Sequence, residues 1–277
     1  MTRLGSMCGA AALLCASAMF STALAQGAAT PSPPDFRPGP DIGWIARGPN
    51  FQLPPSGPHH ITQDPAYPYQ PAGGGEARTF RVADLTNPIL QPWAKEELKK
   101  QNDRVIAGGT GYTRQVSCWP MGTPAFLLYP VAPIYFIQTP KEVLIVTQLN
   151  QEVRHIYMNV FHSEHVKPSW YGESVGHYEG GTLVVDTVGM NGKTFVDNFR
   201  TPHSDRLHTI ERFRMAPDGK SMDVSLHVED PGAFTMPWDS AQHYNRAEQE
   251  RAEVICAENN LNIGDIDPLP IADKPDF

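Results

Sequence analysis

The sequence predicts a mainly β protein, an antiparallel β-barrel or strongly curved sheet of lipocalin-like type, with one or two peripheral helices. Two observations predict this class. Seven short segments with strand-like patterns follow one another between about residues 134 and 229, joined by short turns and without a helical pattern between them. The last segment alternates strictly, and its apolar face consists of Met222, Val224, Leu226 and Val228. Such a sheet hides its edge strands by closing on itself.

The elements can be placed from apolar runs and turn residues. The expected strands are 134–138, 143–148, 152–158, 174–178, 182–188, 207–215 and 222–229. One helix is expected from Pro92 to about Asn102, because proline is favoured at the first helical position and the acidic residues precede the lysines. The segment from Ser240 to Cys256 is rich in Ala, Glu, Gln and Arg, and it is the candidate for a second helix.

The chain divides into three parts. Residues 1–25 have the pattern of an export signal, in which Arg3 precedes an uncharged apolar run and Ala23-Leu24-Ala25 provides the cleavage site. We therefore expect a periplasmic or secreted protein, cleaved near Ala25. Lipidation at Cys15 is a less favoured alternative, because the preceding Leu14 is bulky. Residues 26–75 form a Pro/Gly-rich extended arm or tether, and residues 76–277 form a single β-rich domain.

Charge and hydropathy narrow the choice of partners. The net charge is −8 and there is no basic run, so a nucleic-acid partner is not expected. No segment after the signal approaches the roughly 18 apolar residues that a membrane-spanning helix needs. A small organic molecule is the expected partner, and the sequence does not indicate an oligomeric state.

Two cysteines remain after cleavage of the signal, Cys118 and Cys256. An oxidising compartment favours a disulfide between them. The alternative is two buried free thiols, since free cysteine packs as a small apolar residue.

Six of the ten histidines fall between His155 and His208, which makes this stretch the best candidate for a site. Histidine titrates near neutral pH and serves as an acid, a base or a metal ligand. Strand alternation places the histidines on different faces, so they cannot all belong to one site. The candidate catalytic residues are His155, His177, His208, Asp186, Glu211 and Arg212. The candidate ligand-binding residues are Tyr157, Trp170, Glu173 and His203.

Asp186 shares its face with Val184 and Val188, so we expect it to be buried. A buried carboxylate needs hydrogen bonds or a cation, and Arg212 or Arg200 would supply one. A purely structural Asp–Arg contact is the alternative to a catalytic carboxylate.

Metal ligation is a minor option. His162 and His165 have suitable chemistry at close spacing, but there is no HExxH motif and no thiolate partner. We therefore expect no cofactor and no metal.

The block WYGESVGHYEGGTLVVDT, residues 170–187, resembles a family of uncharacterised exported bacterial proteins, and the segment PHSDRLHTIERFR resembles another part of the same pattern. The resemblance extends over about residues 93–238 and implies no activity. A weaker similarity to lipocalin-like barrels rests on the strand pattern.

Two functions fit these residues. The first is cofactor-free acid–base catalysis on a small organic molecule, of lyase, hydratase or isomerase type, in which histidines exchange a proton and Arg212 or Tyr157 stabilises negative charge. The second is a non-catalytic, lipocalin-like protein that binds an apolar ligand.

Overall fold

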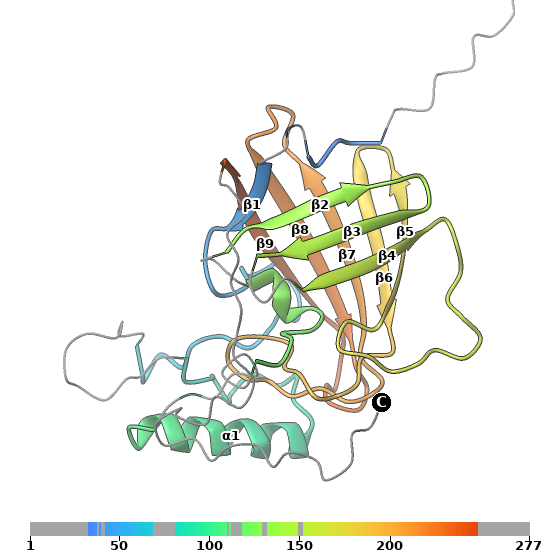
Figure 1. The fold of residues 1–277 in the computed structure, drawn as a ribbon. Coiled ribbons are helices and arrows are strands. Elements are labelled where there is room, and N and C mark those ends of the chain that lie inside the picture. Colours follow the sequence, from blue (N-terminus) through green and yellow to red (C-terminus); the bar gives the residue numbers. More distant parts are fainter. Residues whose placement is uncertain are drawn as a thin grey trace, which may run out of the picture. The chain divides into compact units, whose positions relative to one another are not determined.

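The computed structural model describes residues 33–37, 39, 42–68, 81–109, 111, 118–128, 132–148 and 152–248. Nine strands close into a barrel in sequence order, which confirms the predicted mainly β barrel (Figure 1). The strands are β1 (Ile42–Ala46), β2 (Ile134–Gln138), β3 (Glu142–Thr147), β4 (Val153–Met158), β5 (Glu173–Glu179), β6 (Thr182–Val188), β7 (His208–Met215), β8 (Ser221–Glu229) and β9 (Trp238–Glu248). The expected signal segment lies outside the described residues, so export stays a prediction.

One strand pair departs from the antiparallel pattern. β4 and β5 run parallel, with Ile156 opposite Ser174, whereas every other neighbouring pair is antiparallel. A parallel connection needs a long crossover rather than a tight turn. Residues 159–172, called here the crossover loop, provide it on the outside of the barrel (Figure 1).

Alternating side chains fill the barrel interior. Met222, Val224, Leu226 and Val228 of β8 are all buried, as their alternation predicted. Phe136 stacks on Phe36 at 4.9 Å and meets the edge of Phe213 at 5.8 Å.

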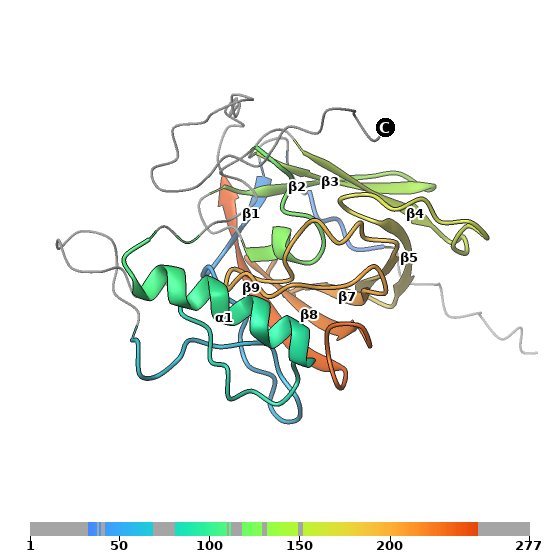
Figure 2. The same cartoon turned by 90° about the horizontal axis from the view of Figure 1, so that it is seen from below.

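Within the described ranges there is one α-helix, α1 (Pro92–Ile106), which lies beyond one end of the strands (Figures 1 and 2). Proline is in its first turn, and Ala94 and Leu98 are buried in the core cluster. Trp93 remains half-exposed, but its indole Nε1 donates to the Gly232 carbonyl at 2.6 Å. A 3-10 turn, η2 (Ala125–Leu128), is buried completely. Among the described residues, no helix has the length and apolar character to cross a membrane.

The expected second helix is wrong over its first half. Residues 238–248 form β9, which pairs with both β8 and β1 and so closes the barrel. Its inward positions include Ser240 and Gln242, whose side chains hydrogen-bond to His60 Nδ1 at 2.8 Å and to the Gly48 carbonyl at 3.1 Å. These polar inward residues conceal the apolar alternation of the strand. Groups of the N-terminal arm satisfy their hydrogen bonds. Residues 249–256 lie outside the described residues.

The N-terminal arm is more integrated than a tether. Its residues 42–46 form β1, and Gln52 makes a further bridge to Ala241 of β9. Trp44 of β1 is fully buried, and its indole Nε1 donates to the Phe36 carbonyl at 2.8 Å.

Candidate functional site

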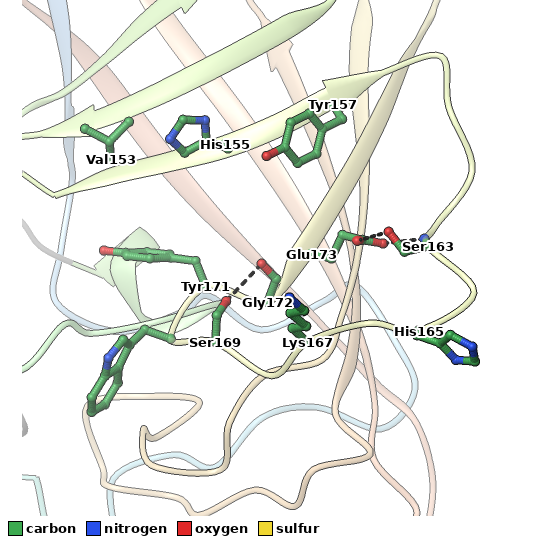
Figure 3. Close-up of a pocket in the computed structure, with 11 residues that line it drawn as sticks. Val153, His155, Tyr157, Ser163, His165, Lys167, Ser169, Tyr171, Gly172 and Glu173 are labelled. Atoms are coloured by element: carbon green, nitrogen blue, oxygen red, sulfur yellow. Dashed lines mark hydrogen bonds between the residues drawn. The ribbon is translucent and has the colours of Figure 1, made fainter. Parts of the chain in front are cut away.

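A groove of about 460 Å³ lies between β4 and the segment that joins the crossover loop to β5 (Figure 3). Figure 3 shows Val153, His155 and Tyr157 along β4 on one side, with Ser169, Tyr171 and Gly172 on the other. The lining residues are Val153, His155, Tyr157, Ser163, His165, Lys167, Ser169, Trp170, Tyr171, Gly172 and Glu173. Four of the predicted site residues therefore meet here: His155, Tyr157, Trp170 and Glu173.

Strand alternation explains how β4 supplies one wall. Arg154, Ile156 and Met158 point into the barrel and are buried, so the intervening Val153, His155 and Tyr157 point outward. The parallel pairing of β4 with β5 brings the end of the crossover loop back beside this outward face.

His155 is held by a carboxylate. Its Nδ1 lies 2.5 Å from Glu142 Oε1 of the neighbouring strand β3, and its ring stacks on Tyr157 with a centroid distance of 6.3 Å. When Nδ1 donates its hydrogen to Glu142, the other ring nitrogen, Nε2, carries the lone pair. An imidazole oriented in this way is able to accept a proton from a ligand in the groove.

The crossover loop is fixed to β5 through Glu173. Its carboxylate accepts hydrogen bonds from the Ser163 backbone N–H at 2.7 Å and the Ser163 hydroxyl at 2.5 Å, and it lies 3.1 Å from His162 Nδ1. The Ser163 hydroxyl bond is the main reason why the pKa of Glu173 lies below its usual value. Gly172 has a φ of +68°, and a Cβ there would lie 2.4 Å from the Val188 carbonyl oxygen, so only glycine fits this close approach.

Aromatic rings form the second wall. Trp170 packs on Trp119 with ring centroids 5.1 Å apart, and the ring of Tyr171 meets the edge of Phe126 at 6.0 Å. The Tyr171 hydroxyl donates to Glu152. Burial, followed by the nearby Glu152 charge, raises the pKa of Tyr171 well above its usual value, so this hydroxyl stays protonated.

A second polar feature, the histidine–carboxylate array, crosses the outside of β5 to β9. Each of its three histidines lies between two carboxylates, at N···O distances of 2.7–3.5 Å. The order of residues across the sheet is Glu173, His162, Asp186, His208, Glu229, His227 and Asp239. A histidine makes two such hydrogen bonds at once only when it is protonated.

These contacts shift the pKa values of His208, His227, Glu229 and Asp186. Hydrogen bonding to Asp186 is the main reason why the pKa of His208 is raised. Burial opposes the charged form of His227, but its bonds to Asp239 and Glu229 raise its pKa overall. The His227 hydrogen bond is the main cause that lowers the pKa of Glu229. Desolvation acts to raise the pKa of Asp186, and its two histidine contacts outweigh it, so that pKa is lowered.

The barrel interior contains an ion pair that the sequence reasoning missed. Arg154 and Glu211 are both buried, with Arg154 Nη1 2.9 Å from Glu211 Oε1. The guanidinium also donates to Ser174 and Thr187 and lies over the Phe126 ring at 4.8 Å. Alternation could have revealed it, because Arg154 shares a face with two apolar residues of β4.

The six predicted catalytic residues do not converge on one barrel pocket. Glu211 faces the interior, whereas His155, His177, His208, Asp186 and Arg212 face outward, because residues of opposite parity on a strand point to opposite sides of the sheet. His177 and Arg212 both contact Glu179, at 2.9 and 2.6 Å, on the outer surface.

The expected burial of Asp186 beside Arg212 or Arg200 is wrong. Its side chain is 39% exposed and contacts His162 and His208 instead, because the outer face of β6 is only partly covered. The Arg200 side chain is buried elsewhere, where it donates to the Arg81 carbonyl at 2.9 Å.

The remaining candidates lie apart from the groove or only partly within it. His203 is buried, with Nε2 2.9 Å from the Thr194 hydroxyl and Nδ1 2.8 Å from the Ser204 carbonyl oxygen. His162 belongs to the array and His165 lines the groove. In the part of the chain that the structure describes, no group of three or more His, Cys, Asp or Glu side chains is placed to hold a metal ion.

Cys118 takes part in a disulfide bond. Cys256 lies outside the described residues, so the pairing of these two cysteines stays a prediction.

Comparison with known proteins adds no assignment, because no protein-family profile, curated protein or solved structure matches this chain.

Proposed function

We propose that the protein acts on a small organic molecule in the groove by cofactor-free acid–base chemistry of lyase, hydratase or isomerase type. One observation carries this proposal: the groove places a histidine oriented by a carboxylate beside aromatic walls. The groove volume of about 460 Å³ suits a small organic ligand, since ligand pockets usually measure about 300–1,000 Å³.

His155 is the proposed general base. Glu142 fixes the orientation of the ring and stabilises the imidazolium that forms when Nε2 takes a proton. The Tyr157 hydroxyl, on the same outward face of β4, is the proposed donor to negative charge that develops on the ligand. Arg212, the other candidate for that role, lies on a different part of the outer surface.

The alternative is a lipocalin-like protein that binds an apolar ligand without turnover. The described inward side chains do not favour a ligand inside the barrel, because Phe136, Phe213 and Ile145 are fully buried and the Arg154–Glu211 pair occupies the same interior. A ligand that binds in the outer groove without turnover would still fit this alternative.

The experiment measures binding and proton transfer separately. A panel of small ring-bearing carbonyl compounds is incubated with the protein in D₂O, and NMR follows deuterium uptake at carbon while ligand-observed spectra report binding. The expected result is exchange that His155→Gln abolishes while binding persists. His243→Gln is the matched control, because His243 also faces a carboxylate, Asp223, but lies on β9 outside the groove. It should leave both exchange and binding intact.

Binding without His155-dependent exchange would overturn the catalytic proposal in favour of the binding protein. Absence of binding across the panel would overturn both functions.

A further inference from the structure

We infer that the ligand of this groove is a small aromatic carboxylate, held with its ring against the aromatic wall and its carboxylate at Lys167. This inference rests on the proposed function and names the class of molecule on which it acts.

The acidic side chains at the groove are already engaged by other groups of the protein. Glu173 accepts hydrogen bonds from Ser163, and Glu142 contacts His155. Glu152 accepts the hydroxyl of Tyr171. Each of these carboxylates already has a donor from the protein, so none requires a cationic ligand to balance it.

Two basic side chains of the groove, unlike its carboxylates, are not engaged by an oppositely charged group of the described residues. Lys167 and His165 line the groove, and no carboxylate among the described residues contacts either of them. On the same loop, His162 is by contrast bound to two carboxylates, those of Glu173 and Asp186. A groove with engaged carboxylates and an available ammonium group favours an anionic ligand, because charge-assisted hydrogen bonds are the stronger ones.

The aromatic walls of the groove favour a ring-bearing ligand. Tyr157 is 47% exposed on one side, and Trp170 and Tyr171 line the other. An exposed tyrosine and a partly buried tryptophan across a groove favour a flat ring, since aromatic pairs gain about 0.5–1.5 kcal/mol beyond their area of contact. His155 stacks on Tyr157 and therefore lies beside the place that the ring of the ligand would occupy.

Three probes of similar length separate the effect of the charge from that of the ring: cinnamate, the neutral cinnamamide and the non-aromatic 3-cyclohexylpropanoate. Their dissociation constants are measured at pH 7 by ligand-observed NMR titration of the full chain. We expect cinnamate to bind about tenfold more tightly than either of the other two, because it alone has both the charge and the planar ring.

Variants assign the contacts. Lys167→Met should weaken cinnamate about tenfold and leave cinnamamide unchanged, whereas Lys167→Arg should restore most of the affinity for cinnamate. Lys220→Met, in the turn between β7 and β8, is the matched control and should change neither. Tyr157→Leu should weaken both aromatic probes, whereas Tyr157→Phe should retain them.

Equal affinity for cinnamate and cinnamamide, or a Lys167→Met variant that weakens both equally, would overturn the aromatic-carboxylate inference. In that case binding that still depends on Tyr157 would leave the proposed function standing. Failure of all three probes, charged and neutral, would overturn the inference and count against the groove as a ligand site.

Discussion

Removal of the Arg154 guanidinium should destabilise the barrel more than any surface change. Arg154 and Glu211 are 1% and 0% exposed, and the guanidinium donates hydrogen bonds to Glu211, Ser174 and Thr187. Arg154→Met leaves the Glu211 carboxylate buried without its cation, which costs about 3–5 kcal/mol. Since single domains are stable by about 5–15 kcal/mol, this loss is a large fraction of the free energy of unfolding.

Two further variants isolate the electrostatic cause. Arg154→Met combined with Glu211→Leu removes both charges, and it should recover most of the lost stability because apolar replacements of buried ion pairs are often neutral or stabilising. Arg212→Met is the matched control on the same strand as Glu211. Its partner Glu179 and Arg212 itself are about half-exposed, so it should cost less than about 1 kcal/mol.

Urea unfolding followed by circular dichroism at pH 7 gives the free energy of unfolding of each variant. The reasoning is refuted if Arg154→Met costs no more than Arg212→Met. It is also refuted if the double variant is less stable than the single one.

Three further predictions concern the array, the groove and the interior. The pKa values of His208 and His227 are raised in the folded state, so the stability they contribute is present below about pH 6.5 and is lost as pH rises through the folded values. In urea unfolding, the wild type should therefore exceed the double variant His208→Gln, His227→Gln by more at about pH 6 than at about pH 8. Gly172→Ala should cost about 1–2 kcal/mol for its left-handed backbone and about 1–3 kcal/mol more for the clash at 2.4 Å, whereas Gly180→Ala, with nothing within 4 Å, should cost only the first amount. Thr209→Val should change the free energy of unfolding by less than about 0.5 kcal/mol or stabilise the protein, because its buried hydroxyl has no partner among the described residues.

Each of these three predictions has a distinct contradictory outcome. A histidine effect that is independent of pH would show that the array does not stabilise through protonation. Equal losses for the two glycine variants would mean that the loop relaxes around an added methyl group. A loss above about 1 kcal/mol for Thr209→Val would imply a hydrogen bond to that hydroxyl. For comparison, Thr201→Val removes a hydroxyl that donates to Asp197 at 2.7 Å, and should cost about 1–2 kcal/mol.

Three strands could be predicted from the sequence with almost their observed bounds. The strands Ile134–Gln138 and Thr182–Val188 were predicted with their observed bounds, and Ser221–Glu229 to within one residue. Ser221–Glu229 alternates strictly, so periodicity reveals it, whereas the other two are apolar-rich segments that turn residues delimit.

The strand at 238–248 could not be predicted in this way. Its inward positions Ser240 and Gln242 are polar, and they are satisfied by the N-terminal arm about 180 residues earlier in the chain. Tertiary contacts therefore override a composition that favours a helix.

Part of the groove could be predicted as well. His155 and Tyr157 were assigned from their residue types and shared face, and Trp170 and Glu173 from their neighbourhood. The groove itself depends on the parallel pairing of β4 with β5, which no local pattern specifies. Asp186 was expected to be buried because Val184 and Val188 share its face, but alternation does not say which face of the strand is inward.

The most direct test of the central claim is a crystal structure of the protein with bound cinnamate. We expect ligand density between β4 and the end of the crossover loop, with the ring beside Tyr157 and the carboxylate at Lys167. Density inside the barrel or on another face, with an empty groove at a saturating ligand concentration, would contradict this claim.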